Sequence, residues 1–255
     1  MVALARLGLR TRYIGAVGSD REGDYQIESL RQEEVDVSCL RVIEGAQSQS
    51  AFILIDQPTG ERTVLWRRDE KLAMEPDRVD RAAVTSGRVL HLDGHDTFAA
   101  IRAATCAREA GIPVVLDIDN IYEGADRLLP LVDFLISSGS FPERMTGISD
   151  LRSALKALSS KTGSLFVAAT MGDQGVLAFF KGSFIHSPSF GIDCKDTTGA
   201  GDAFHGGFIY GLLAGYSVEE TLRFANAVAA LKCRELGART GLPGIEEVKG
   251  FLRDR

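Results

Sequence analysis

Asp196-Thr197-Thr198-Gly199-Ala200-Gly201-Asp202 is the stretch of this 255-residue sequence that decides its fold and its chemistry. Two glycines flank an alanine directly before a long helical pattern. Small residues let backbone N–H groups approach an anion closely, and a helix N-terminus adds unsatisfied donors and a positive dipole end. The carboxylate of Asp202 could accept a proton from an attacking hydroxyl. This pairing predicts phosphoryl transfer, which needs charge stabilisation and an oriented nucleophile.

A purely structural role explains the same residues. Asp is favoured in the first turn of a helix, so Asp202 could simply cap a glycine-rich turn. Two other nucleotide-binding signatures are absent from the sequence. There is no Gly-Lys dipeptide and therefore no Walker-type loop, and no G-x-G-x-x-G follows the first expected strand, which argues against a dehydrogenase.

Strand-like and helix-like segments alternate along most of the chain. Such alternation predicts a mainly parallel sheet covered by helices, with ligands bound at the carboxyl ends of the strands. The expected strands are residues 12–17, 51–55, 62–66, 88–93, 113–117, 131–136 and 165–169. The expected helices are residues 20–32, 97–110, 150–160, 200–214, 218–236 and 244–252.

One segment, residues 48–69, lies outside this alternation. Its two strands alternate polar and apolar residues and are joined by a turn containing Pro58 and Gly60, which predicts a β-hairpin serving as a lid or interface sheet. An exposed apolar hairpin is an edge open to pairing, so we predict a homodimer formed through it. The alternative is a monomer whose lid closes over its own site.

Composition narrows the class of protein. Hydrophobic residues make up 45% and charged residues 25%, as in an ordinary globular protein. The net charge of -6 argues against nucleic acid, and no apolar run is long enough for a membrane partner. Cys39, Cys106, Cys194 and Cys233 form no C-x-x-C pair, which favours reduced thiols in a cytoplasmic protein over a zinc site or disulfides.

Residues 196–208 (D-T-T-G-A-G-D-A-F-H-G-G-F) resemble the C-terminal signature of the ribokinase-like sugar kinases, the phosphofructokinase-B family. Further similar motifs follow the family's order along the chain. They are Ile14-Gly15-Ala16-Val17-Gly18-Ser19-Asp20, Gly60-Glu61-Arg62-Thr63, Thr170-Met171-Gly172-Asp173-Gln174-Gly175, Phe224-Ala225-Asn226-Ala227 and Gly237-Ala238-Arg239-Thr240. The resemblance implies a three-layer α/β/α sandwich with a mainly parallel central sheet, formed by one domain over residues 1–255 with the lid inserted at 48–69.

The resemblance also implies roles for the residues of the site. Asp202 would be the general base, and the backbone N–H groups of Gly199, Ala200 and Gly201 would hold the migrating phosphoryl group. The donor would be ATP with Mg²⁺. Thr170, Gly172 and Gly175 would line the nucleotide, with Asn226 near the adenine. Asp196 and Thr198 match positions that in many members hold a monovalent cation, usually K⁺.

Three departures from the family pattern matter. The family's first strand, with a sugar-binding Asp, and the following Gly-Gly and Asn have no counterpart before Leu4, which suggests an N-terminally truncated kinase or a non-catalytic nucleotide-binding remnant. Ser138 and Phe141 replace the family's N-x-x-E; Ser138 could still reach the nucleotide, whereas Phe141 cannot act as an acid. His95 stands where several members have an Arg. It is interpreted either as a surface histidine or as a contact to phosphate or substrate.

These substitutions favour the ketohexokinase-like branch. A ketose or pentose is the expected sugar substrate, with a nucleoside or sugar phosphate as the alternative.

Overall fold

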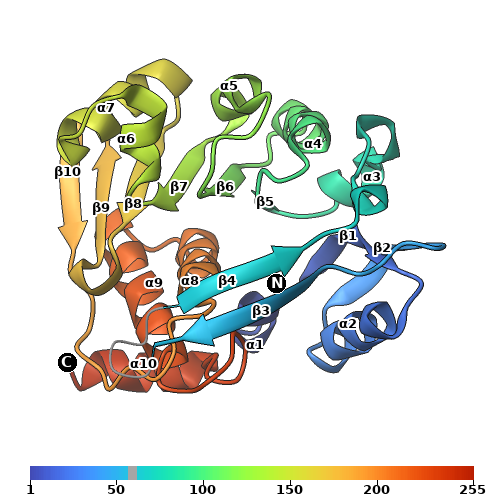
Figure 1. Cartoon of the computed structure of the whole chain (residues 1–255). Helices are drawn as coiled ribbons and strands as arrows, with labels where there is room; N and C mark the ends of the chain where they lie inside the picture. Colours follow the sequence, from blue (N-terminus) through green and yellow to red (C-terminus); the bar gives the residue numbers. More distant parts are fainter. Residues whose placement is uncertain (57–61) are drawn as a thin grey trace. The chain divides into compact units, whose positions relative to one another are not determined.

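The computed structural model describes residues 1–56 and 62–255 (Figure 1). Residues 57–61, which include Pro58, Gly60 and Glu61 of the predicted turn, lie outside the described residues. The chain divides into two compact units: Met1–Ala73 together with Phe190–Arg255, and Met74–Ser189. The prediction of one domain over residues 1–255 stays a prediction.

The unit Met74–Ser189 contains a six-stranded mixed sheet, ordered β10-β9-β8-β7-β6-β5. Neighbouring strands from β5 to β8 run parallel, and β9 and β10 are added antiparallel. The strands are β5 (Leu90–Leu92), β6 (Val114–Ile118), β7 (Phe134–Ser138), β8 (Phe166–Thr170), β9 (Val176–Phe180) and β10 (Ser183–Ser187). The mainly parallel sheet predicted from the sequence is therefore confirmed, and its central strands are buried apolar runs, as helix-covered parallel strands usually are.

Helices of the same unit pack on this sheet, with α4 against β5 and β6 and α7 against β8 and β9. Helix α7 shows how the local sequence sets its ends. The side chain of Asp150 accepts a hydrogen bond from the Ser153 N–H at 2.8 Å, and Gly163 ends the helix in a left-handed conformation. The helices are α3 (Arg81–Thr85), α4 (Thr97–Glu109), α5 (Ala125–Leu128), α6 (Phe141–Thr146) and α7 (Leu151–Thr162), with short 3-10 turns η2 (Pro76–Arg78), η3 (Leu129–Leu131) and η4 (Gly172–Gln174).

The other unit is mainly helical. Its helices are α1 (Val2–Arg6), α2 (Arg21–Gln32), α8 (Ala200–Ala214), α9 (Val218–Lys232) and α10 (Ile245–Arg253), with the 3-10 turn η1 (Glu70–Leu72). Helix α9 begins at a capping box formed by Ser217 and Glu220. The core joins α8, α9 and α10 through buried side chains, namely Leu7, Ala203, Phe224, Ala227, Val228, Leu231 and Val248. This core holds the first turn of α8 and the end of α9, the two parts that carry the candidate site.

A two-stranded parallel sheet also belongs to this unit, formed by β1 (Arg12–Gly18) and β2 (Asp36–Ile43). Strand β1 was expected from the sequence, whereas β2 was not. Strand β2 has no fully buried residue, and Asp36 and Arg41 interrupt its apolar pattern. A half-exposed strand of this kind gives a weak periodic signal.

The hairpin strands β3 (Ser50–Ile55) and β4 (Arg62–Arg67) pair antiparallel (Figure 1). Phe52 lies opposite Leu65, and Ile53 lies opposite Val64. All four side chains are exposed, as is Trp66. The structure thus contains the antiparallel pair expected within residues 48–69, and its role as a lid stays a prediction.

Two expected boundaries were wrong. The strand expected at 131–136 is found at Phe134–Ser138, because Pro130 helps form a 3-10 turn over Leu129–Leu131. The helix expected to end at 236 ends at Lys232, where the Cys233 carbonyl accepts hydrogen bonds from the N–H groups of residues 195 and 196.

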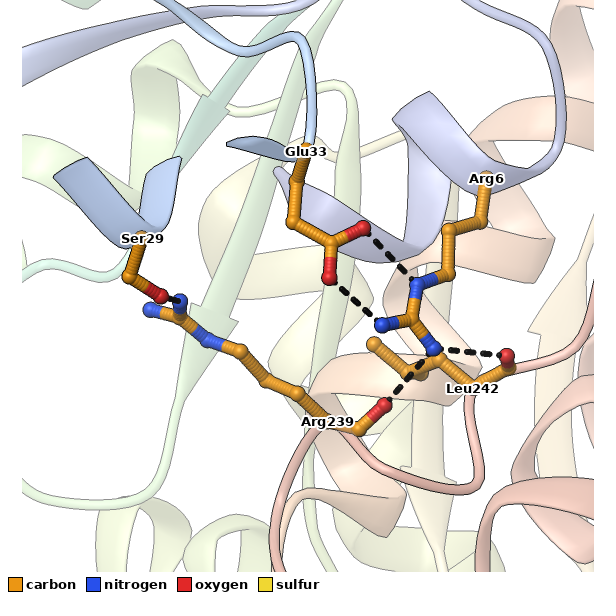
Figure 2. A network of polar contacts seen from close by, with 5 residues as sticks. All are labelled: Arg6, Ser29, Glu33, Arg239 and Leu242. Atoms are coloured by element: carbon orange, nitrogen blue, oxygen red, sulfur yellow. Dashed lines mark hydrogen bonds and ion pairs between the residues drawn. The ribbon is translucent and has the colours of Figure 1, made fainter. Parts of the chain in front are cut away.

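Arg6 ties the first helix to two other segments of its unit (Figure 2). Its guanidinium pairs with both carboxylate oxygens of Glu33, at 2.9 and 2.5 Å. It also donates to the carbonyls of Arg239 and Leu242, at 2.9 and 3.0 Å. Arg239 in turn donates to the Ser29 hydroxyl at 2.7 Å. One side chain therefore fixes both the end of α2 and the loop after α9.

Across the described residues, no helix combines the length and apolar character needed to cross a membrane.

Candidate active site

The turn that precedes α8 is organised by the side chain of Asp196. This residue is 1% exposed. Its Oδ1 accepts the Thr198 N–H at 2.7 Å, and its Oδ2 accepts the Gly237 N–H at 2.8 Å. Burial acts to raise the pKa of Asp196, but the hydrogen bonds from Thr198 and Gly237 and the charge of Lys232 together hold this pKa below its usual value. Asp196 is therefore an ionised carboxylate that shapes the turn, and each of its two oxygens accepts a backbone hydrogen bond.

Gly199 lets the chain enter α8 in its observed direction. Its φ of 77° is in the left-handed region, and a Cβ there would lie 2.8 Å from the Ala238 carbonyl oxygen. The first bond of the helical ladder runs from the Ala203 N–H to the Gly199 carbonyl, at 2.9 Å. The N–H groups of Gly201 and Asp202 precede this ladder. The Ala200 N–H already donates to the Thr197 carbonyl at 3.0 Å.

Asp202 lies in the first turn of the 15-residue helix α8 and is exposed, as is Gly201. The N-terminal ammonium of Met1 is close enough to interact with it: burial lowers the pKa of that ammonium, and the Asp202 charge opposes the shift. An accessible carboxylate therefore lies in the first turn of α8, at the positive end of the helix.

Lys232 is the residue of this region that sequence reasoning missed. It is the last residue of α9 and is 0% exposed. Its Nζ donates to the backbone carbonyl of Asp196 at 2.7 Å. The signal in the sequence was a lysine inside the apolar run Ala229-Ala230-Leu231-Lys232-Cys233. A lysine buried in such a run needs a hydrogen-bonding or charged partner. Asn226 lies on the same helix and is also buried.

The residues predicted to contact nucleotide in the unit Met74–Ser189 lie together. Ser138 ends β7, Thr170 ends β8, and the two are paired in the sheet register. The Thr170 hydroxyl donates to the Ser137 carbonyl at 3.3 Å. The chain then turns through η4, where Gly172 has a φ of 60°. This is the carboxyl edge of parallel strands, where such sheets bind ligands.

Gly175 closes that turn and could not be replaced without moving the backbone. Its φ is 88°, and a Cβ would lie 2.2 Å from the Ser187 carbonyl oxygen. Its own carbonyl accepts the Met171 N–H at 2.7 Å. Phe141, in helix α6 after β7, is 0% exposed and belongs to the core.

His95 lies in an acidic environment after β5. Its backbone N–H donates to Asp93 at 3.0 Å, and its ring meets the edge of Tyr122 at 5.3 Å between centroids. Burial raises the pKa of Tyr122 to about 12, assisted by the carboxylates of Asp119, Asp93 and Asp117. These charges favour neutral or cationic groups near His95 over a phosphate.

A mainly parallel α/β fold with an accessible carboxylate at a glycine-flanked helix N-terminus is the kind of site that phosphotransferases use. The family model described as pfkB family carbohydrate kinase matches residues 1–245. The chain belongs to this family and is a carbohydrate kinase, which confirms the resemblance drawn from residues 196–208. The ribokinase-like fold is confirmed with it.

Individual relatives agree with this assignment. The chain is 33% identical to the ATP-dependent ribose-1-phosphate kinase of Halopiger xanaduensis, over 99% of this chain and 84% of that protein. It is 30% identical to the ribokinase of Haemophilus influenzae, over 98% of this chain and 84% of that protein. The structure of Arabidopsis thaliana ribokinase complexed with ribose and ATP matches with a TM-score of 0.86 at 25% identity, covering 99% of this chain and 85% of that one.

Proposed function

We propose that this protein transfers a phosphoryl group from ATP to a hydroxyl of a small sugar, with Asp202 as the general base. The observation that carries the proposal is the position of Asp202. It is exposed, lies in the first turn of α8, and follows a glycine whose left-handed conformation starts that helix. The buried Asp196 cannot take the same role, because both of its carboxylate oxygens accept backbone N–H groups.

In this mechanism the carboxylate of Asp202 would accept the proton of the sugar hydroxyl as that oxygen bonds to the terminal phosphorus of ATP, while the bond from that phosphorus to the bridging oxygen breaks and ADP leaves. Charge developing on the transferred group is stabilised by the N–H groups at residues 199–201 and by the helix dipole. Because the Ala200 N–H donates to Thr197 in the present conformation, it would have to be shared with or released to the phosphoryl group, whereas Gly201 needs no such change.

The nucleotide is assigned to Ser138, Thr170, Gly172 and Gly175 at the carboxyl ends of β7 and β8, with Asn226 toward the adenine. Among the described residues, no group of three or more His, Cys, Asp or Glu side chains could hold a metal ion. On this proposal Mg²⁺ is held by the phosphates of ATP and by water, as is usual for kinases.

The acceptor is proposed to be a ketose or pentose. Asp93, Asp119 and the ring of His95 offer hydrogen-bonding groups suited to sugar hydroxyls. A second candidate acceptor, a sugar phosphate, is favoured by the 33% identity to a ribose-1-phosphate kinase. The acidic surroundings of His95 argue against a phosphate at that position, so a sugar phosphate would need its phosphate elsewhere.

Asp202→Asn tests the proposal, because it preserves size and removes the base. ATP-dependent phosphorylation would be measured with a panel of ketoses, pentoses, nucleosides and sugar phosphates. We expect kcat to fall by roughly 10²- to 10⁴-fold. Asp193→Asn, at an exposed acid before the same turn, is the control and should keep wild-type kcat. An Asp202→Asn enzyme with unchanged kcat would exclude Asp202 as the base.

We further propose that the β3–β4 hairpin forms a homodimer interface. Phe52, Leu54 and Leu65 are 66%, 52% and 60% exposed, and the strand register puts them on one face of the hairpin. Leu65→Glu should convert a dimer to a monomer in light scattering, whereas Leu165→Glu, at an exposed leucine of the other unit, should not. A wild-type monomer at micromolar concentration contradicts this proposal.

A further inference from the structure

The turn before α8 already contains a buried positive charge. Lys232 has no exposed surface, and its ammonium lies 2.7 Å from the backbone oxygen of Asp196. A lysine is rarely buried completely unless it is paired. Here the nearby partner is the ionised Asp196, whose lowered pKa reflects the Lys232 charge among its causes. The ammonium is therefore held by a hydrogen bond to the backbone of Asp196 at the base of the turn.

All three oxygens of Asp196 are occupied. The carboxylate oxygens accept the Thr198 and Gly237 N–H groups, and the backbone oxygen accepts Lys232. The buried Thr198 hydroxyl lies near the same carboxylate without a well-formed hydrogen bond to any described residue. One hydroxyl is a poor substitute for the several oxygen ligands that a hard cation needs.

A second monovalent cation beside Lys232 would also be repelled. Two like charges in direct contact repel strongly in a partly buried site, where water screens them little. The residues present at Asp196 and Thr198 therefore do not fit K⁺, although the resemblance to the family implied that ion there.

We propose that the Lys232 ammonium is a built-in monovalent cation that supplies the positive charge of the Asp196–Asp202 turn, so that the enzyme works without K⁺. This inference rests on the proposed function for its catalytic meaning. Its structural content is independent of catalysis: a fixed charge at the end of α9 organises Asp196, which in turn positions the Thr198 N–H that leads into α8.

Potassium titration at constant ionic strength, balanced with tetramethylammonium, tests the inference. Two quantities would be measured on the whole chain: the Tm of the ligand-free protein and the Kd for adenylyl imidodiphosphate with Mg²⁺. Wild type should show no saturable response to K⁺ in either. Lys232→Met, which keeps the aliphatic stem, should weaken nucleotide binding on the order of tenfold, as expected for loss of one charge in a partly buried site.

Lys232→Ala adds the converse test, because it opens space for an ion. Potassium should then raise Tm and tighten nucleotide binding, while tetramethylammonium should not. Lys195→Ala is the control. This lysine directly precedes Asp196, but its side chain is 51% exposed and pairs with Glu235. It should behave as wild type.

Three results would overturn the inference: a saturable K⁺ response in the wild type, wild-type nucleotide affinity in Lys232→Met, or a Lys232→Ala protein indifferent to K⁺. If Lys232→Ala does not fold, the first two measurements decide. Failure of the proposed function would be seen separately, as unchanged kcat in Asp202→Asn, and would leave the Tm titration valid.

Discussion

The two glycines that flank Ala200 should respond in opposite ways to a methyl group. Gly199 has a φ of 77°, and an added Cβ would lie 2.8 Å from the Ala238 carbonyl oxygen and 3.1 Å from the Ala238 Cβ. The left-handed conformation costs an Ala residue about 1–2 kcal/mol, and overpacking typically adds about 1–3 kcal/mol. Gly199→Ala is therefore expected to reduce the free energy of unfolding by about 2–5 kcal/mol.

Gly201 differs in both respects. It lies within α8, and a Cβ there would meet nothing within 4 Å. Because Ala is favoured over Gly in helices by about 0.5–1 kcal/mol, Gly201→Ala should leave stability unchanged or raise it slightly. Its methyl group would nevertheless stand where the phosphoryl group is proposed to approach the helix, so kcat should fall at least about tenfold.

Thermal unfolding and steady-state kinetics on both variants separate these effects. For a chain of this length, the Gly199→Ala change should lower Tm by roughly 5–15 °C. Equal destabilisation by the two substitutions would refute the structural reasoning, because the argument depends on the difference between a strained and an open position. A stable Gly201→Ala enzyme with wild-type kcat would refute the proposed approach of the phosphoryl group.

Three further predictions concern stability and reactivity. Arg6→Ala removes four hydrogen bonds and should lower the free energy of unfolding, measured in urea, by about 2–3 kcal/mol. An equal loss on replacing an exposed arginine would argue against a specific network. Burial raises the pKa of Cys233 to about 11, so at pH 8 only about one Cys233 thiol in a thousand is ionised, and mass spectrometry should find that iodoacetamide labels Cys194 before Cys233. Hydrogen bonds from Ser38 lower the pKa of Asp36 from 3.8 to about 2, so its stabilisation is complete above about pH 4 and lost toward pH 2; Asp36→Asn should flatten the stability loss measured across that window.

The sheet of the unit Met74–Ser189 was the part of the fold most accessible from the sequence. Its strands are short apolar runs separated by clear helix signals, as in Val114–Ile118 followed by polar residues. Strand β2 could not be found in the same way, because its side chains are all partly exposed and its sequence therefore lacks a buried face. The pairing of β2 with β1 is a long-range contact that periodicity does not encode.

The candidate site likewise contains features that the sequence predicts and features that depend on contacts between distant residues. Local chemistry predicted a site at residues 199–202, since glycine, helix start and carboxylate are adjacent in sequence, and this role stays a prediction. The register pairs Ser138 with Thr170 at the ends of β7 and β8, which the expected strand bounds 131–136 and 165–169 did not include. Lys232 was missed because its meaning depends on Asp196, which is 36 residues away in sequence. The occupation of the Ala200 N–H by Thr197 could not be read from the sequence either.

The two carboxylates that bracket the turn show how environment separates their roles. Asp196 and Asp202 are chemically identical and six positions apart, yet one is buried with every oxygen engaged and the other is exposed at a helix N-terminus. A base must change its protonation state, which a carboxylate held by two backbone donors and a buried ammonium resists. On the function proposed above, Asp196 is the fixed anion near the Lys232 charge, and Asp202 is the group that accepts the proton of the substrate hydroxyl. Exchanging the roles would require breaking the two hydrogen bonds that the Asp196 carboxylate accepts, so rescue of Asp202→Asn by Asp196 is not expected.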